Sequence, residues 1–219
     1  MSEPEDPTQE PCCFDDWVAH WDRRASRGKP VAGVTARLVE ALEEAGLADR
    51  RVLDVGCGIG DLAIETLARG ASSATGFDLS AKAIDHAREL AATRGVADRT
   101  TFEVGDGSIV DLPPADVVVL NRVVCCYRNT DGLLDMTLRA AGTVFALTAP
   151  VSDGATGVFN RAVNGFWNTW YSLRRRKFGG FRTFVHELDE IDERVRRAGF
   201  RRVAHERRRV VWDLAVYAR

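Results

Sequence analysis

The chain has 219 residues, the size of one ordinary globular domain, and its 45% hydrophobic and 28% charged residues exclude disordered and fibrous classes. The formal net charge of −2 hides a net charge of +8 over residues 160–219, which could meet an anionic substrate or nucleic acid or form solvated faces. No apolar run approaches the roughly 20 residues of a membrane helix, and the acidic, Pro-rich start is unlike a secretory signal. We therefore expect a cytoplasmic protein with no membrane span.

The predicted elements begin after residues 1–11, which we expect to be a disordered acidic tail. Apolar residues recur at helical spacing in residues 14–27 and 31–45, so residues 12–50 are predicted to form N-terminal helices. From Arg51 short apolar runs alternate with amphipathic segments. Strands are predicted at residues 51–55, 74–77, 100–104, 116–120 and 143–148, with helices at 61–69, 80–94 and 130–140. This alternation indicates an α/β fold with a mostly parallel sheet and helices on both faces.

The last third of the chain departs from this pattern. Residues 152–184 are rich in aromatic side chains and are predicted to form an insertion. A helix is expected at residues 187–198, followed by two strand-like runs at 200–207 and 210–218. No crossover helix fits between these two runs, so they should pair as an antiparallel hairpin at one edge of the sheet. We expect residues 51–219 to form one domain with this cap inserted.

The five cysteines indicate neither a disulfide framework nor a metal site. Cys12 and Cys13 form one vicinal pair, Cys125 and Cys126 form another, and Cys57 stands alone. No C-x-x-C spacing occurs and no histidine lies at ligand spacing, so no metal is predicted. An odd count fits reduced thiols, and Cys125 and Cys126 are expected to pack as small buried hydrophobes.

The strongest local motif is the sequence VLDVGCGIG at residues 52–60, an apolar strand that runs into a Gly-x-Gly-x-Gly turn before a helix. Glycines are needed where the backbone turns sharply and approaches a ligand without a Cβ in the way. The dinucleotide fingerprint would need a third glycine where Asp61 stands, and an acidic helix start would repel a diphosphate. The turn is therefore predicted to serve a ligand that is not a diphosphate; a purely structural turn is the alternative.

Polar residues follow the next three strands of the predicted sheet. Asp78 lies 22 residues after Gly56, where a carboxylate can accept both hydroxyls of a ribose, although it could instead cap the following helix. Asp106 could accept an adenine amine or simply form a turn. Asn121 and Arg122 follow the fourth strand and should face the crevice where such sheets bind ligands.

Together these motifs resemble the class I S-adenosylmethionine-dependent methyltransferases, over about residues 31–219. The residues 120–127, LNRVVCCY, are also similar to a bacterial subgroup related to the magnesium-protoporphyrin O-methyltransferases, with Arg128 in place of a proline. The resemblance implies a Rossmann-like, seven-stranded, mostly parallel sheet with an antiparallel last strand, and S-adenosylmethionine as cofactor, with S-adenosylhomocysteine as product. The implied cofactor-binding residues are Asp54, Gly56, Cys57, Gly58, Gly60, Asp78, Leu79, Asp106, Gly107 and Asn121.

The resemblance also implies methyl transfer to a nucleophilic atom held in line with the donor. A general base is needed only where the acceptor must lose a proton, and the candidates are His20, Tyr127 and His186. The N-terminal helices are expected to close over the cofactor, and residues 152–184 lie where this fold builds its substrate cap. The predicted substrate-binding residues are Trp17, Trp21, Arg122, Phe166, Trp167, Trp170 and Arg182.

We therefore expect a methyltransferase that acts on a small, apolar or aromatic metabolite, with O-methylation favoured. The alternatives are an RNA or protein methyltransferase, which the basic C-terminal third would serve, and a non-catalytic S-adenosylmethionine-binding module. A nicotinamide-dependent oxidoreductase is disfavoured by Asp61. With one dense basic cluster at residues 174–177 and no nucleic-acid module, RNA is the weaker partner. The sequence does not name the acceptor or the oligomeric state.

Overall fold

The computed structural model describes residues 14–15, 18, 31–127, 130–174, 181–208 and 211–219. Its helices are α2 (Val34–Glu44), α3 (Asp61–Ala68), α4 (Ala81–Thr93), α5 (Thr130–Ala140), α6 (Gly154–Leu173) and α8 (Leu188–Arg197), with short 3-10 turns η1 (Ala97–Arg99) and η2 (Val124–Cys126). Its strands are β1 (Arg51–Val55), β2 (Ser73–Asp78), β3 (Thr100–Val104), β4 (Ala115–Asn121), β5 (Ala141–Pro150), β6 (Arg201–Arg208) and β7 (Trp212–Ala218).

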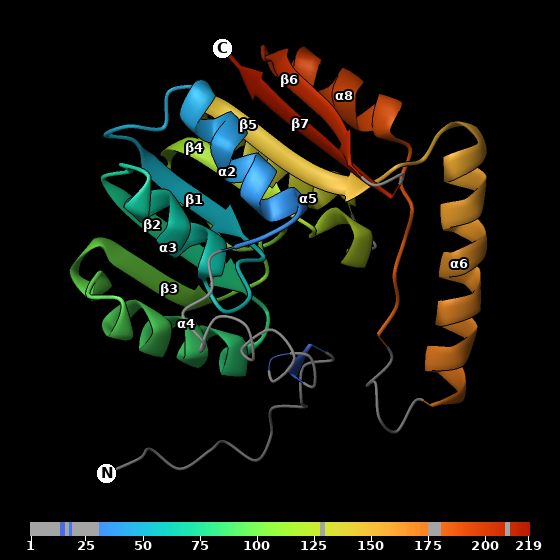
Figure 1. The fold of residues 1–219 in the computed structure, drawn as a ribbon, viewed down its shortest axis with the longest axis horizontal. Coiled ribbons are helices and arrows are strands. Elements are labelled where there is room, and N and C mark those ends of the chain that lie inside the picture. The colour runs from blue at the N-terminus through green and yellow to red at the C-terminus, as the bar shows by residue number, and fades with distance from the viewer. Residues whose placement is uncertain (1–13, 16–17, 19–30, 128–129, 175–180, 209–210) are drawn as a thin grey trace.

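The seven strands form one sheet in the order β3-β2-β1-β4-β5-β7-β6 (Figure 1). The first five pair in parallel, whereas β7 is antiparallel to both of its neighbours, β5 and β6. The predicted hairpin is thus confirmed at one edge of the sheet. Its first strand, β6, forms the edge, and its second strand, β7, lies between β6 and β5. Because β2 and β4 flank β1, the strand order reverses there, and ligands of open α/β sheets bind outside the carboxyl ends at such a point.

Helices cover both faces of the sheet. On one face α2, α3 and α4 bury a core that includes Leu38, Leu42, Leu62 and Ile84. On the other face α5 and α8 pack over Phe145 and its apolar neighbours. The central strands β1 and β4 are apolar along nearly their whole length because both of their faces are covered. This two-sided burial fixes the strand ends that carry the polar residues of the candidate site.

The predicted elements agree with the structure within a few residues at each end. The predicted strand at residues 143–148 extends in the structure to Ala141–Pro150, because its pairing with β7 runs from Val144 to Pro150. Helix α2 packs against β5, β7 and α3, so this part of the predicted N-terminal helices belongs to the body of the fold. Most of residues 12–30 and the whole predicted tail lie outside the described residues. Among the described helices, none is both long and apolar enough to cross a bilayer.

Candidate functional site

The glycine-rich turn links β1 to α3 at the point of strand-order reversal. Gly56, Gly58 and Gly60 all have positive φ angles, of 76°, 53° and 74°, which side chains other than glycine rarely adopt. The backbone N–H groups of Gly56 and Cys57 both donate to the carbonyl oxygen of Phe77, at 2.7 and 3.0 Å. The turn is therefore fastened to the end of β2 by its own backbone.

Neighbouring side chains pack directly against this turn. A Cβ atom on Gly56 would lie 2.5 Å from Cγ2 of Val123, and one on Gly60 would lie 2.7 Å from Cζ of Phe102. Gly107, after β3, is equally confined, because a Cβ there would meet Val55. These glycines let the backbone pass close to neighbouring side chains at the carboxyl edge of the sheet.

Asp78 connects the glycine turn to the start of α4. Its two carboxylate oxygens accept hydrogen bonds from the backbone N–H groups of Gly58, at 2.8 Å, and of Ser80, at 2.9 Å. Burial raises the pKa of Asp78, and those backbone donors oppose the shift. The N-cap of α4 is Ser80, whose hydroxyl accepts from the N–H of Ala83, so the capping alternative for Asp78 is not what the structure shows.

Asp54 lies beneath the turn and is the least satisfied polar group among the described residues. It is 1% exposed, and neither carboxylate oxygen has a hydrogen-bond partner. Burial raises the pKa of Asp54 well above its usual range, the charges of Asp61 and Asp78 add to the shift, and the Ala63 backbone opposes it. Burying a carboxylate without a partner costs folding free energy. We therefore expect a ligand that carries a positive charge or donates a hydrogen bond to bind near Asp54.

Asp106, just after β3, is held by two side chains. Tyr127 donates its hydroxyl hydrogen bond to Oδ1, and Ser108 donates to the same oxygen from its backbone N–H at 2.9 Å and from its hydroxyl at 2.8 Å. Partial burial acts to raise the pKa of Asp106, but these hydrogen bonds outweigh it and lower the pKa. Oδ2 has no partner among the described residues, and this leaves it available to a ligand amine.

Tyr127 is fully engaged in this contact. Its hydroxyl lies 2.9 Å from that of Ser108 as well as against Asp106. Burial together with the neighbouring Asp106 carboxylate raises the pKa of Tyr127 to about 12. The hydroxyl is therefore protonated at neutral pH, and in this geometry it donates its hydrogen bond to Asp106.

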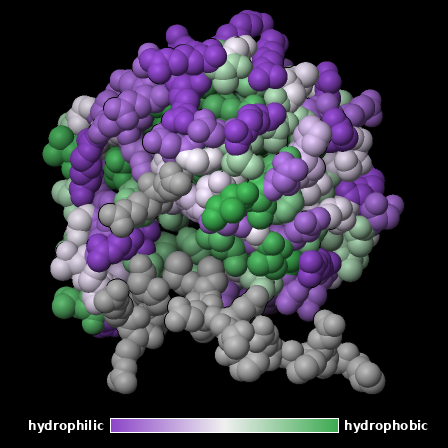
Figure 2. All heavy atoms as spheres, turned by 180° about the vertical axis from the view of Figure 1, so that it is seen from behind, coloured by the Kyte–Doolittle hydropathy of each residue, from purple (hydrophilic) through white to green (hydrophobic). Residues whose placement is uncertain are grey.

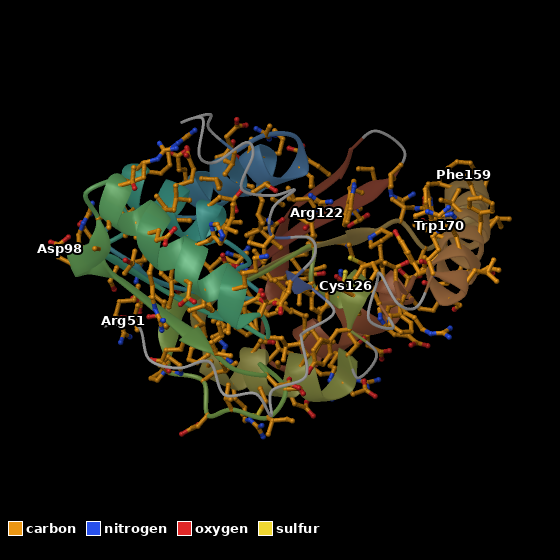
Figure 3. The ribbon with its side chains drawn as sticks, turned by 90° about the horizontal axis from the view of Figure 1, so that it is seen from below. Arg51, Asp98, Arg122, Cys126, Phe159 and Trp170 are labelled. Atoms are coloured by element: carbon orange, nitrogen blue, oxygen red, sulfur yellow. The ribbon has the colours of Figure 1, made fainter. Side chains whose placement is uncertain are left out.

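Asn121 and Arg122 end β4 but are bound within the protein. The amide of Asn121 donates to Thr35 at 3.2 Å and its oxygen accepts from Thr148 at 2.9 Å. Arg122 has a φ of 62°, and its guanidinium lies 4.9 Å from the ring centre of Trp212 in a cation–π contact. Figure 3 shows Arg122 and Cys126 near the middle of the molecule, away from Arg51 and Asp98 at the opposite end of the sheet.

His186 is likewise committed to the protein backbone. One ring nitrogen, Nε2, lies 2.9 Å from the carbonyl oxygen of Tyr127 and 3.0 Å from the hydroxyl of Thr130. These contacts tie the segment before α8 to the loop after β4. Leu79 is 37% exposed beside Asp78. Of the two thiols predicted to pack as buried hydrophobes, Cys125 is buried but Cys126 is only half-buried, and Cys57 is buried as well.

Three described residues of the N-terminal segment cross the carboxyl edge of the sheet. Val18 is fully buried against Ile59 of the glycine turn and Ala83 of α4. Asp15 accepts a hydrogen bond from the hydroxyl of Ser80. The predicted residues Trp17, His20 and Trp21 lie outside the described residues. The contacts of Asp15 and Val18 place this segment beside Asp78.

Aromatic rings connect α6 to this N-terminal segment. Successive ring centres lie 5.2–5.9 Å apart from Phe166 through Trp167, Tyr171 and Phe181 to Phe14. Burial raises the pKa of Tyr171, and the nearby Cys126 adds to the shift, so this row of rings passes the loop after β4. Trp170 contacts Trp167 and Tyr171, whereas Arg182 is exposed and reaches Ser172 at 3.4 Å.

Sequence reasoning missed the contacts that join these parts. The Ser108 hydroxyl follows Asp106 by two residues, a spacing typical of Asx turns that could have marked it. The contacts of Asp15 and Val18 join segments 65 residues apart, and no local pattern predicts them.

Comparison with known proteins agrees with this geometry. Residues 52–142 match a family described as a methyltransferase domain. Ribosomal protein L11 methyltransferase of Shewanella baltica (strain OS195) is 31% identical over 139 residues, which are 64% of this chain and 45% of that protein. The same-named protein of Pasteurella multocida (strain Pm70) is 45% identical over 132 residues, covering 60% and 44%. The chain thus spans less than half the length of these curated relatives.

Solved structures show the same fold. The magnesium protoporphyrin IX methyltransferase ChlM of Synechocystis PCC 6803, with bound S-adenosylhomocysteine, superposes with a TM-score of 0.64 at 20% identity, covering 100% of this chain and 90% of that one. The [4+2]-cyclase SpnF superposes with a TM-score of 0.70 at 18% identity, covering 94% and 93%. The sequence match covers residues 52–142, and the solved structures show that the chain shares their overall fold.

Proposed function

We propose that this protein transfers the methyl group of S-adenosylmethionine to an oxygen atom of a small, apolar or aromatic acceptor. The observation that carries the proposal is the unpartnered, buried carboxylate of Asp54 beneath a glycine turn, at an edge that also presents Asp78 and Asp106. Bound S-adenosylmethionine supplies an electrophilic methyl group on a positively charged sulfonium.

The residues at this edge fit that cofactor. The edge carries several carboxylates, which suit a positively charged cofactor. Asp61 in the first turn of α3 would in addition repel the diphosphate of a nicotinamide dinucleotide. Asp54 would face the α-ammonium group at the amino-acid end of the cofactor. Asp78 would accept hydrogen bonds from the ribose hydroxyls, and Oδ2 of Asp106 would accept one from the adenine amine. The remaining contact residues of the proposed site are Gly56, Cys57, Gly58, Gly60, Leu79 and Gly107.

The row of aromatic rings supports an apolar acceptor. Trp167, Tyr171 and Phe181 lead from α6 to Phe14, next to the segment that contacts the glycine turn. Flat, apolar rings of this kind favour an aromatic or apolar molecule over a highly charged one. An acceptor that is already anionic, such as a carboxylate, needs no general base. His20 stays a candidate base on sequence grounds.

Tyr127→Phe separates positioning from catalysis. Removing the hydroxyl leaves Asp106 with only the Ser108 donors, so S-adenosylhomocysteine should bind about 3–10-fold more weakly, which is about 1 kcal/mol, the typical net worth of one hydrogen bond. Isothermal titration calorimetry measures this change. Unchanged binding together with lost methyl transfer would instead make Tyr127 a catalytic residue.

The proposal is tested by methyl transfer from S-adenosylmethionine to a panel of hydroxylated and carboxylated aromatic compounds. Formation of S-adenosylhomocysteine that depends on the acceptor, and is lost in Asp78→Ala, is the expected result. Cofactor binding without turnover of any acceptor would favour a non-catalytic module or another reaction, since the fold also occurs in the cyclase SpnF.

A protein methyltransferase is the second candidate, because the curated relatives are named for ribosomal protein L11. The same assay with ribosomal proteins as acceptors separates the two, with RNA as a further arm. Methylation of a polypeptide, and of none of the small molecules, would overturn the proposed acceptor class and keep the cofactor assignment.

A further inference from the structure

Helix α6 stands beside the sheet, past the end of β5 (Figure 1), and polar side chains along one side of it form hydrogen bonds with the protein. Asn160 donates to the carbonyl oxygen of Val151 at 2.8 Å. Asn164 and Asn168 donate to the carbonyl oxygen of Thr183 at 2.9 and 2.8 Å. The three asparagines recur every four residues, so they form one stripe along the helix. Hydrogen bonds from this stripe, together with the ring contact between Tyr171 and Phe181, attach the helix to the body.

The opposite side of α6 is apolar and lies in solvent. The side chains of Phe159, Phe166 and Leu173 are 58, 66 and 81% exposed, and Val158 and Val163 share this exposed face. Figure 2 shows hydrophobic residues at the margin of the molecule where α6 lies, and Figure 3 shows Phe159 at the outer side of the helix. An apolar face of this kind marks an interaction surface. We call Val158, Phe159, Val163, Phe166 and Leu173 the outer face.

A described basic residue, Arg174, lies at the C-terminal end of α6, and three more basic residues follow it in the sequence. Helix α6 contains no Asp or Glu, and its C-terminal end is followed in the sequence by Arg174, Arg175, Arg176 and Lys177. Arg174 is exposed, with its guanidinium 4.7 Å from the ring centre of Trp170. A helix with aromatic residues on one side and a cluster of basic residues beside it is complementary to an anionic lipid surface.

We propose that the outer face of α6 docks on an anionic membrane surface, lying in the plane of the headgroups. A second copy of the chain is the competing occupant, because Phe159, Val163, Phe166, Trp170 and Leu173 recur at the spacing of a coiled-coil seam. The flanks of that seam, however, carry no acidic residues with which a partner helix could form register-setting ion pairs. The absence of acidic residues from α6 and the basic residues 174–177 that follow it in the sequence therefore favour the lipid surface.

The test is sedimentation of the full-length protein with vesicles of phosphatidylcholine alone or mixed with phosphatidylglycerol. We expect binding to the anionic vesicles to be about tenfold stronger and to weaken as salt is added. The double variant Phe159→Ser with Leu173→Ser should bind about tenfold more weakly, and Arg174→Gln about fivefold more weakly. Val203→Ser, at an exposed position of β6, is the matched control and should bind as the wild type does.

Two results would overturn the proposal. The first is an equal lack of binding to both vesicle types; the second is a concentration-dependent dimer in analytical ultracentrifugation that the double variant abolishes. Binding of S-adenosylhomocysteine, measured on the same variants, shows that they remain folded. Because docking requires no methyl transfer, the vesicle result is independent of the proposed activity.

Discussion

Asp54→Asn is expected to stabilise the ligand-free protein while it weakens binding of S-adenosylhomocysteine. The buried carboxylate has no hydrogen-bond partner, so an uncharged amide of the same shape removes a desolvation cost and should raise the free energy of unfolding by about 1 kcal/mol at neutral pH. The same change removes the negative charge proposed to face the α-ammonium group, which S-adenosylhomocysteine shares with S-adenosylmethionine, so affinity should fall by about tenfold or more. Urea denaturation and calorimetry measure the two effects.

The stability difference should depend on pH with a definite sign. Folding raises the pKa of Asp54, so the folded protein binds this proton more tightly than the unfolded chain does. The free energy of unfolding of the wild type therefore falls as pH rises above the unfolded pKa of about 4. Asp54→Asn lacks this loss, so its advantage should grow from about pH 4 toward neutral pH.

Asp213 provides the control for this experiment. It is buried like Asp54, at 5% exposure, but its Oδ2 forms a hydrogen bond with Nε2 of His205 at 2.8 Å. Asp213→Asn should therefore lower the free energy of unfolding, because it weakens a charge-assisted pair instead of relieving an unpaired charge. A loss of stability in Asp54→Asn as well would show that the Asp54 carboxylate has a stabilising partner in the protein.

Asp78→Ala is expected to weaken binding of S-adenosylhomocysteine by about 5–150-fold, or about 1–3 kcal/mol, the range for losing a buried hydrogen bond to a charged group. The substitution also frees the N–H of Gly58, so the glycine turn keeps its backbone bonds to Phe77 but loses its bond to the Asp78 side chain. Calorimetry with the wild type, the variant and NADH as a second ligand gives the result.

Asp98→Ala is the matched control, because Asp98 is exposed at the opposite end of the sheet (Figure 3). It should bind S-adenosylhomocysteine as the wild type does. An unchanged affinity in Asp78→Ala would contradict the proposed role of that carboxylate. If the wild type bound NADH and not S-adenosylhomocysteine, the cofactor assignment itself would be wrong.

The sequence predicts the part of the site whose signals are local. The glycine spacing at residues 56–60 marks a turn because only glycine adopts the observed positive φ angles easily, and the apolar run before it marks β1. Asp78 and Asp106 follow from their places at strand ends, since the carboxyl ends of parallel strands share one edge.

The remaining features depend on contacts between distant segments. Tyr127 follows β4 and Asp106 follows β3, so their contact depends on the strand order β3-β2-β1-β4, and the sequence does not state which strands are neighbours. The aromatic residues of α6 predict a helix, but Phe166 lies largely in solvent because the asparagine stripe, and not the apolar stripe, faces the protein. Helical periodicity shows that two faces differ and does not show which one the body takes.

The insertion of β7 between β5 and β6 has a consequence for folding order. Helix α2 packs on β5 and β7, and Arg37 of α2 forms an ion pair with Glu206 of β6, 169 residues away. The core on that face therefore combines the early and late parts of the chain, and long loops must close before its contacts form. We therefore expect the first five strands to pair before the terminal hairpin joins the sheet, and α2 to complete its burial only at that last step.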